Sequence, residues 1–123
     1  MASSRASAVR PISILVVDDD HDSADGIAML LRHWNHRVAV AYEGLRAIRL
    51  FRGLHPDLVL LDIDLPGMDG YEVAGRMRRE NHGVFLVALT GTADRERSIA
   101  AGFTKHIRKP FRPDAIRELI AEL

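Results

Sequence analysis

Short apolar segments alternate with amphipathic segments along the whole chain. The apolar runs lie at residues 12–17, 38–41, 58–61 and 84–89, with a more polar fifth run at residues 103–107. Nearly continuous aliphatic runs of this length are typical of strands buried on both faces. Each run is followed by a segment whose apolar residues recur every three to four positions, as in helices with one buried face, at about residues 22–34, 43–53, 71–80, 94–101 and 113–123.

Five strands that alternate with five helices predict an α/β fold with a parallel sheet and right-handed crossovers. Two strand orders are common for doubly wound sheets of this kind. A single five-stranded domain fits the flavodoxin-like order 2-1-3-4-5 better than the six-stranded dinucleotide-binding order, and no glycine-rich phosphate loop follows any strand. We therefore expect a three-layer (βα)5 sandwich.

Helical spacing also predicts how individual side chains are placed. The inward-facing apolar residues of the first two helices are expected to be Ile27, Leu30, Leu31, Trp34, Leu45, Ile48, Phe51 and Leu54. Asp22 or Ser23 is expected to cap the first helix. His36 is expected at the surface, and the arginine-rich residues 76–79 are expected to form a solvated helix face.

Length and composition restrict the class of protein. A chain of 123 residues has room for one domain with a single sizeable core. Its 17 basic and 17 acidic residues cancel, which argues against binding to nucleic acid or to an anionic membrane through bulk charge. The absence of cysteine excludes disulfides and thiolate metal sites. We expect no direct contact with nucleic acid.

The N-terminal residues and the length of the apolar runs predict where the protein is located. Residues 1–11 lack the apolar segment of a secretory signal and are expected to form a disordered tail, which leaves residues 12–123 as the domain. The longest fully apolar run is too short to cross a bilayer, so no membrane insertion is expected. A cytoplasmic location is the default prediction.

Reactive or charged side chains follow four of the five predicted strands. Asp18 and Asp19 follow the first strand, Asp62 the third, Thr90 the fourth and Lys109 the fifth. In the 2-1-3-4-5 order the carboxyl ends of the first and third strands flank the crevice where ligands bind. The sequence therefore predicts that these side chains form one site.

The chemistry of this set indicates phosphoryl transfer. Three converging carboxylates raise one another's pKa unless a cation lies among them, and a site with only oxygen ligands selects a hard cation such as Mg²⁺, or Mn²⁺. A carboxylate can attack phosphorus and hold it as an acyl phosphate. We assign Asp62 as the nucleophile, Asp18 and Asp19 to the metal, Lys109 as the counter-charge and Thr90 as a hydroxyl donor to a phosphoryl oxygen.

Five segments resemble the receiver domain of two-component response regulators. They are LVVDD at residues 15–19, LLD at 60–62, PGMDG at 66–70, ALTG at 88–91 and KPF at 109–111. The resemblance extends from about residue 12 to residue 123, with every motif in the family's order and spacing. It implies that Asp62 takes a phosphoryl group from a phosphohistidine on a sensor histidine kinase or a histidine phosphotransfer protein. It also implies a switch that assists only its own phosphorylation and dephosphorylation, and not a turnover enzyme.

The resemblance implies a more detailed metal site. The side chains of Asp19 and Asp62 and the backbone carbonyl of Asp64 are the expected metal ligands, with Asp18 acting largely through a metal-bound water. The peptide bond before Pro110 is expected to be cis.

The resemblance further implies how the switch works. The phosphoryl group draws the Thr90 hydroxyl inward, and the aromatic residue three positions before Lys109 moves into the vacated space. That position holds His106, whose imidazole is smaller than the usual Tyr or Phe and can titrate near neutral pH. The alternative is that His106 is an exposed edge-strand residue without a role. Asp64 and Thr92 are expected to tune how fast the phosphoryl group is hydrolysed.

Partners are inferred from the same resemblance. The last two helices and the edge strand form the expected partner face, with the basic residues Arg95, Arg97, Lys105, Arg108, Arg112 and Arg117. The partner is a downstream protein or a fused output domain, and phosphorylation-dependent dimerisation stays open. The segments GYEVA, AGF and HIRKP favour a receiver of the kind fused to hybrid sensor histidine kinases over a stand-alone receiver.

Two other functions are compatible with parts of the pattern. A haloacid-dehalogenase-like phosphatase also carries an Asp-x-Asp pair after an apolar strand, which Asp62 and Asp64 would match. That family's nucleophile normally follows its first strand and its acidic metal pair normally follows the lysine. A pseudo-receiver that only binds a partner is disfavoured by the complete set of acidic, hydroxyl and lysine residues.

Overall fold

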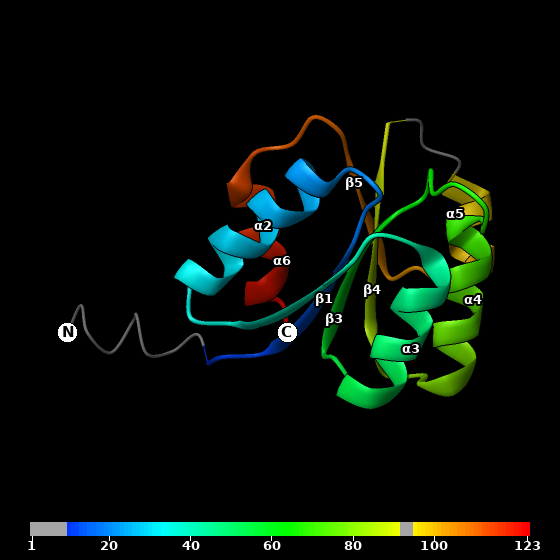
Figure 1. The fold of residues 1–123 in the computed structure, drawn as a ribbon, viewed down its shortest axis with the longest axis horizontal. Helices are drawn as coiled ribbons and strands as arrows, with labels where there is room; N and C mark the ends of the chain where they lie inside the picture. Colours follow the sequence, from blue (N-terminus) through cyan, green and yellow to red (C-terminus); the bar gives the residue numbers. More distant parts are fainter. Residues whose placement is uncertain (1–9, 92–94) are drawn as a thin grey trace.

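The computed structural model describes residues 10–91 and 95–123, which form one parallel five-stranded sheet between two layers of helices (Figure 1). The strands are β1 (Ser13–Val17), β2 (Arg37–Ala41), β3 (Leu58–Asp62), β4 (Phe85–Thr90) and β5 (Lys105–Arg108). Their order is β2-β1-β3-β4-β5, and every neighbouring pair is parallel. The predicted fold class and strand order are confirmed.

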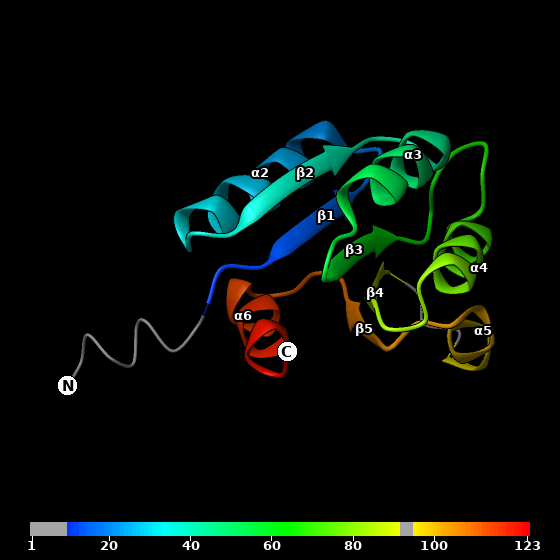
Figure 2. The same cartoon turned by 90° about the horizontal axis from the view of Figure 1, so that it is seen from below.

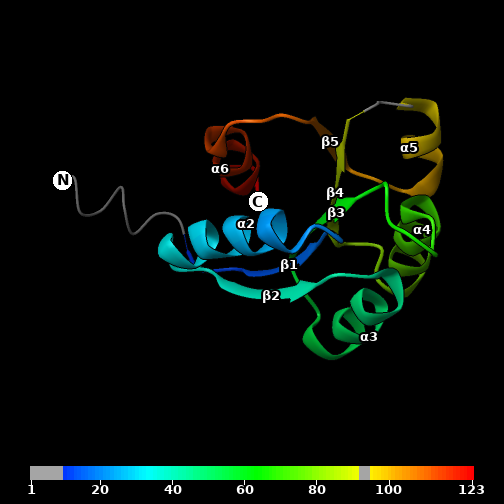
Figure 3. The same cartoon turned by 45° about the horizontal axis from the view of Figure 1, so that its top comes forward.

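Helices cover both faces of this sheet. They are α2 (His21–His33), α3 (Gly44–Leu54), α4 (Gly70–Glu80), α5 (Arg95–Ala101) and α6 (Pro113–Ala121). α2 and α6 lie on one face, and α3, α4 and α5 lie on the other (Figures 2 and 3). None of these helices is long and apolar enough to span a membrane, within the part of the chain that is described.

Alternating side chains of the central strands supply the two cores. Leu15, Val59 and Leu61 pack with α3 and α4, whereas Val16 and Leu60 pack with α2 and α6. Strands β1, β3 and β4 are therefore buried on both faces, which explains why their sequences are nearly continuous apolar runs. The more polar β5 lies at an edge of the sheet, as its composition predicts.

Two leucines of α3 do not face the core as helical spacing predicts. Leu45 is 50% exposed and Leu54 is 43% exposed, whereas Ile48 and Phe51 are buried. Gly44 occupies the inward position at the start of α3, and the helix approaches α4 so closely there that a Cβ on Gly44 would lie 2.9 Å from Val73. Leu54 is the last residue of the helix, which the left-handed conformation of His55 (φ 49°) ends.

The cap of α2 is Asp20, and the prediction of Asp22 or Ser23 was wrong. The carboxylate of Asp20 accepts hydrogen bonds from the backbone N–H groups of Asp22 (3.1 Å) and Ser23 (3.4 Å) and from the Ser23 hydroxyl (3.1 Å). The hydrogen bonds from Ser23 lower the pKa of Asp20. α2 thus begins at His21, two to three residues earlier than a cap at Asp22 or Ser23 would place its start, because the charged segment there is itself helical.

His36 is buried, contrary to the surface position expected for it. Its side chain is 6% exposed, and its Nδ1 accepts a hydrogen bond of 3.2 Å from the backbone N–H of Ile12. The left-handed conformation of Asn35 (φ 70°) turns the chain back toward the sheet and places His36 directly before β2. Burial disfavours the charged imidazole and lowers the pKa of His36.

The stability of the domain is expected to fall in mildly acidic solution because of His36. Its pKa in the folded state lies below the ordinary value of 6.5, so the unfolded chain binds the proton first as the pH drops below 6.5. Between pH 7.5 and pH 5.5, the free energy of unfolding should fall more for wild type than for His36→Asn. The amide oxygen of this variant can still accept the hydrogen bond from the backbone N–H of Ile12. Equal losses in denaturant titrations of both proteins would contradict this role.

Candidate functional site

The two central carboxylates are positioned by neighbouring strands. Asp18 follows β1 and Asp62 ends β3, and the two strands pair Val17 with Leu61 directly before them. The backbone N–H of Asp18 donates to the carbonyl of Ala41 on β2 at 3.1 Å, so the sheet's hydrogen bonding continues as far as the site. Asp18 is 1% exposed and Asp62 is 5% exposed.

A third carboxylate completes an acidic cluster. Asp18, Asp19 and Asp62 each offer an oxygen, and these three oxygens all lie within 4.8 Å of one another. Asp19 is exposed, whereas the other two are buried, so the cluster opens to solvent on one side. An all-oxygen donor set with an open side suits Mg²⁺, which prefers carboxylates and keeps several waters. The residues present therefore fit a divalent hard cation.

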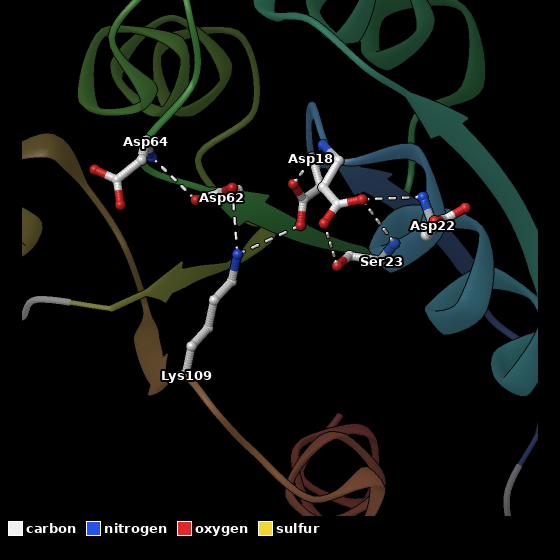
Figure 4. Close-up of polar contacts among 7 residues, drawn as sticks. Asp18, Asp22, Ser23, Asp62, Asp64 and Lys109 are labelled. Carbon is white, nitrogen blue, oxygen red and sulfur yellow. Dashed lines mark hydrogen bonds and ion pairs between the residues drawn. The ribbon is translucent and has the colours of Figure 1, made fainter.

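Lys109, the residue directly after β5, joins the cluster. Its Nζ lies 3.4 Å from Oδ2 of Asp18 and 3.3 Å from Oδ2 of Asp62 (Figure 4). The backbone N–H of Lys109 donates to the carbonyl of Thr90 at 2.8 Å, which ties the residue to the end of β4. The Lys109–Pro110 peptide bond is cis. The ammonium group thus bridges the two buried carboxylates.

The charges of the site perturb two pKa values. Burial favours the neutral form of Asp18 and raises its pKa, and the nearby Asp62 raises it further. The hydrogen bond from the Asp20 backbone N–H and the charge of Lys109 act in the opposite direction, but the pKa of Asp18 stays raised. Burial alone would lower the pKa of Lys109, but the charges of Asp62 and Asp18 outweigh it and raise the pKa. Lys109 is therefore charged at neutral pH, and the two carboxylates share a single ammonium group.

Replacing Asp18 by Asn is expected to stabilise the metal-free protein. Because its folded pKa is raised, Asp18 contributes stability that is fully present below pH 3.8 and is lost as the pH rises through the folded pKa. At pH 7.5 Asp18→Asn should raise the melting temperature by about 2–5 °C. Magnesium should then stabilise wild type more than the variant, because binding to the folded state adds stability. A lower melting temperature for metal-free Asp18→Asn would contradict this.

The remaining predicted site residues differ in burial and in their contacts with the cluster. Thr90 is buried at the end of β4, and His106 is exposed on β5 opposite Ala88. The backbone N–H of Asp64 donates to Oδ1 of Asp62 at 3.0 Å, while its exposed carboxylate points away from Asp62 (Figure 4). Thr92 lies outside the described residues.

Residues 14–121 match the response regulator receiver domain family. The chain belongs to this family. It is thus a receiver domain of two-component signalling, and this assignment replaces the haloacid-dehalogenase-like alternative. Receiver domains of this family bind Mg²⁺ at an acidic pocket, and the structure brings Asp18, Asp19 and Asp62 together in an acidic cluster.

Related proteins are about twice as long as this chain. The receiver is 42% identical over 113 residues to the DNA-binding response regulator MtrA of Mycolicibacterium paratuberculosis, covering 89% of this chain and 48% of that protein. It is 35% identical over 117 residues to the probable transcriptional regulatory protein TcrX of Mycobacterium tuberculosis, and this match covers 93% of this chain and 49% of that protein. The chain therefore spans about half the length of these relatives.

Solved structures show the same fold. A CheY-like response regulator receiver domain protein from Methanospirillum hungatei superposes with a TM-score of 0.87 at 29% identity and covers 92% of this chain and 93% of that chain. The BeF3-activated DrrB receiver domain gives a TM-score of 0.79 at 26% identity, and the match covers 93% of this chain and 100% of that chain. These likenesses agree with the strand order of the receiver described here.

Sequence analysis missed a cavity beside the acidic cluster. The cavity has a volume of about 490 Å³ and lies between the start of α2 and the segment after β5. Its lining residues are Asp18, Ser23, Ile27, Lys109, Pro110 and Phe111. Ile27 was assigned to the core of α2, and in the structure it is half-buried at this opening. No feature of the sequence alone brings Ile27 and Phe111 together.

Proposed function

We propose that this receiver accepts one phosphoryl group on Asp62 from a phosphohistidine, in a reaction that requires Mg²⁺ or Mn²⁺. The observation that carries the proposal is the position of Lys109 Nζ, within 3.4 Å of both Asp18 and Asp62 at the edge of the three-carboxylate cluster. An acceptor carboxylate, a cation site and a fixed ammonium group are what phosphoryl transfer requires, since its catalysis is mostly positioning and charge stabilisation.

The transfer is a single displacement at phosphorus. A carboxylate oxygen of Asp62 forms the new P–O bond as the P–N bond to the donor imidazole breaks, and the bonding pair returns to the ring nitrogen. The Lys109 ammonium group binds a phosphoryl oxygen, and the Thr90 hydroxyl donates to another. Hydrolysis of the acyl phosphate later restores the carboxylate of Asp62. The receiver is a switch under this proposal and turns over no separate substrate.

The metal would be held by the acidic side of the site. The side chains of Asp19 and Asp62 and the backbone carbonyl of Asp64 would be its ligands, with Asp18 acting through a bound water. When bound, the divalent cation neutralises charge on the phosphoryl oxygens. Asp18 also keeps Lys109 directed toward Asp62, because both carboxylates pair with the same ammonium group.

Partners follow from the surfaces beside the site. The apolar lining of the 490 Å³ cavity, formed by Ile27, Pro110 and Phe111, suits an apolar side chain of the protein that presents the phosphohistidine. That donor would be a sensor histidine kinase or a histidine phosphotransfer protein. A hybrid kinase is one chain that could contain this receiver, and a cytoplasmic location is consistent with such donors.

The output surface would be formed by α5, β5 and α6. His106 lines a hollow of this surface together with Ile99 and Phe103, so a change at Thr90 could alter the position of the exposed imidazole. A downstream protein, a fused output domain or a second receiver would bind there. Because the curated relatives include proteins named as DNA-binding regulators, a fused DNA-binding segment is one such output.

Two phosphate compounds distinguish this proposal from a phosphatase. Phosphoramidate carries a P–N bond like that of phosphohistidine, whereas 4-nitrophenyl phosphate is a phosphomonoester. We expect phosphoramidate with Mg²⁺ to load at most one phosphoryl group per chain, and 4-nitrophenyl phosphate to release no nitrophenol above the buffer rate. Multiple turnovers of the monoester would indicate a phosphatase, and absence of loading by any small donor would indicate a pseudo-receiver.

A further inference from the structure

Arg97 of α5 bridges to the segment that connects β3 with α4. Its Nη2 lies 2.5 Å from Oδ2 of Asp69, and its guanidinium carbon lies 4.2 Å from the centroid of the Tyr71 ring. The other carboxylate oxygen of Asp69 accepts a hydrogen bond of 2.9 Å from the backbone N–H of Tyr71 and so caps α4. One carboxylate therefore fastens both the start of α4 and the middle of α5. We call the contact of Arg97 with Asp69 and Tyr71 the α5 clamp.

The segment between Asp62 and Asp69 is tightly closed. The backbone N–H of Asp64 donates to Oδ1 of Asp62 at 3.0 Å, and the N–H of Gly70 donates to the carbonyl of Ile63 at 3.2 Å. A Cβ on Gly70 would lie 2.6 Å from Cα of Ile63, so the two ends of the segment are in close contact. The segment therefore forms a short, hydrogen-bonded connection from Asp62 to Asp69.

The clamp also reaches the connection between α5 and β5. The Tyr71 ring packs edge-on against Phe103 with centroids 6.2 Å apart, and Phe103 is buried. The side chains of Arg97 and Asp69 are 57% and 41% exposed, so their ion pair is screened by water and weak enough to open and close readily. A weak contact at this place is suited to a reversible change and contributes little to the stability of the fold.

We propose that Arg97 is a positioning residue that holds α5 against the segment following the phosphoacceptor and releases α5 when Asp62 is phosphorylated. This inference rests on the proposed function. Phosphorylation turns one carboxylate oxygen of Asp62 into the bridging oxygen of an acyl phosphate and removes the carboxylate charge, which weakens the acceptor for the Asp64 N–H and shifts the segment that carries Asp69. Release of α5 then alters the output surface independently of Thr90 and His106.

The clamp predicts a non-additive effect on the exchange of α5 amides. In unphosphorylated protein, Arg97→Ala and Asp69→Asn should each speed hydrogen exchange in α5 by about three- to tenfold, the range for an exposed ion pair with a cation–π contact. Asp69→Asn keeps the oxygen that caps α4. The double variant should exchange no faster than Arg97→Ala, and Arg97→Lys should lie between wild type and Arg97→Ala.

Arg117→Ala provides a matched control, because Arg117 also stacks on an aromatic ring, that of Trp34, but lies on α6. It should leave α5 exchange unchanged. Additive effects in the double variant, or unchanged α5 exchange in Arg97→Ala, would overturn the inference.

The release step is tested on the same samples after phosphorylation with acetyl phosphate and Mg²⁺. Intact mass first establishes whether the wild-type chain carries the phosphoryl group, and hydrogen exchange is then measured on that sample. α5 of the phosphorylated wild type should exchange as fast as α5 of unphosphorylated Arg97→Ala. An adduct with unchanged α5 exchange would overturn the inference alone. Absence of any adduct would overturn the proposed function and the release step with it.

Discussion

Lys109→Met is expected to slow phosphorylation of Asp62 by about 10²–10³-fold, the usual effect of removing one fixed group that stabilises charge in the transition state. The ammonium group of Lys109 lies 3.3 Å from Oδ2 of Asp62, where a transferred phosphoryl group would place its oxygens. Met keeps most of the aliphatic length of the side chain and removes only its charge. Initial rates with acetyl phosphate and Mg²⁺, followed by intact mass, measure the effect.

The second lysine of the chain is a matched control for this prediction. Lys105 is exposed on β5, and its Nζ pairs with Glu122 at 2.6 Å, away from the acidic cluster. Lys105→Met should therefore be phosphorylated at the wild-type rate. If Lys109→Met and Lys105→Met were phosphorylated at the same rate, the ammonium group of Lys109 would have no part in the transfer.

Arg78→Met is expected to lower the free energy of unfolding by about 2–4 kcal/mol, because hydrogen bonds from a charged donor to partly buried acceptors are lost together. The guanidinium group donates to the carbonyls of Gly102 (2.8 Å), His82 (2.7 Å) and Val84 (2.7 Å), and to the Thr104 hydroxyl (3.1 Å). These acceptors belong to two loops, residues 82–84 and 102–104, and Arg78 joins both loops to α4. Denaturant titration monitored by circular dichroism measures the loss.

The prediction for Arg78 has a control on the same helix. Arg79 is the next residue of α4 and is exposed, so Arg79→Met should change the unfolding free energy by less than about 0.5 kcal/mol. Arg78→Lys should recover only part of the loss, because an ammonium group cannot reproduce the planar fork of donors. A similar stability for Arg78→Met and Arg79→Met would show that water replaces these hydrogen bonds at no cost.

The fold was predictable because its main determinants are local in sequence. Strands β1, β3 and β4 are buried on both faces, so their apolar runs stand out from the amphipathic helices between them. The site was predictable because parallel strands end at one edge of the sheet, which brings Asp18, Asp62 and Lys109 together once the order is known. Composition and spacing alone sufficed for these conclusions.

The features that sequence analysis missed depend on contacts between distant segments. Arg78 was expected in solvent because its neighbours in α4 are charged, but the carbonyl groups of Gly102 and Val84 draw its side chain inward. His36 was assigned to the surface because nothing in its local sequence shows that Ile12 lies beside it. The clamp between Asp69 and Arg97 likewise joins the N-cap of α4 to a residue of α5. Periodicity carries no signal for such pairs.

The most direct test of the account is the intact mass of wild type and Asp62→Asn after incubation with acetyl phosphate, with and without Mg²⁺. The account predicts a single acid-labile phosphoryl adduct on wild type that requires Mg²⁺ and is absent from Asp62→Asn, since an amide cannot form the acyl phosphate. An adduct of equal yield on Asp62→Asn would contradict the assignment of Asp62 as the phosphoacceptor, and an adduct of equal yield without a divalent cation would contradict the metal requirement of this site.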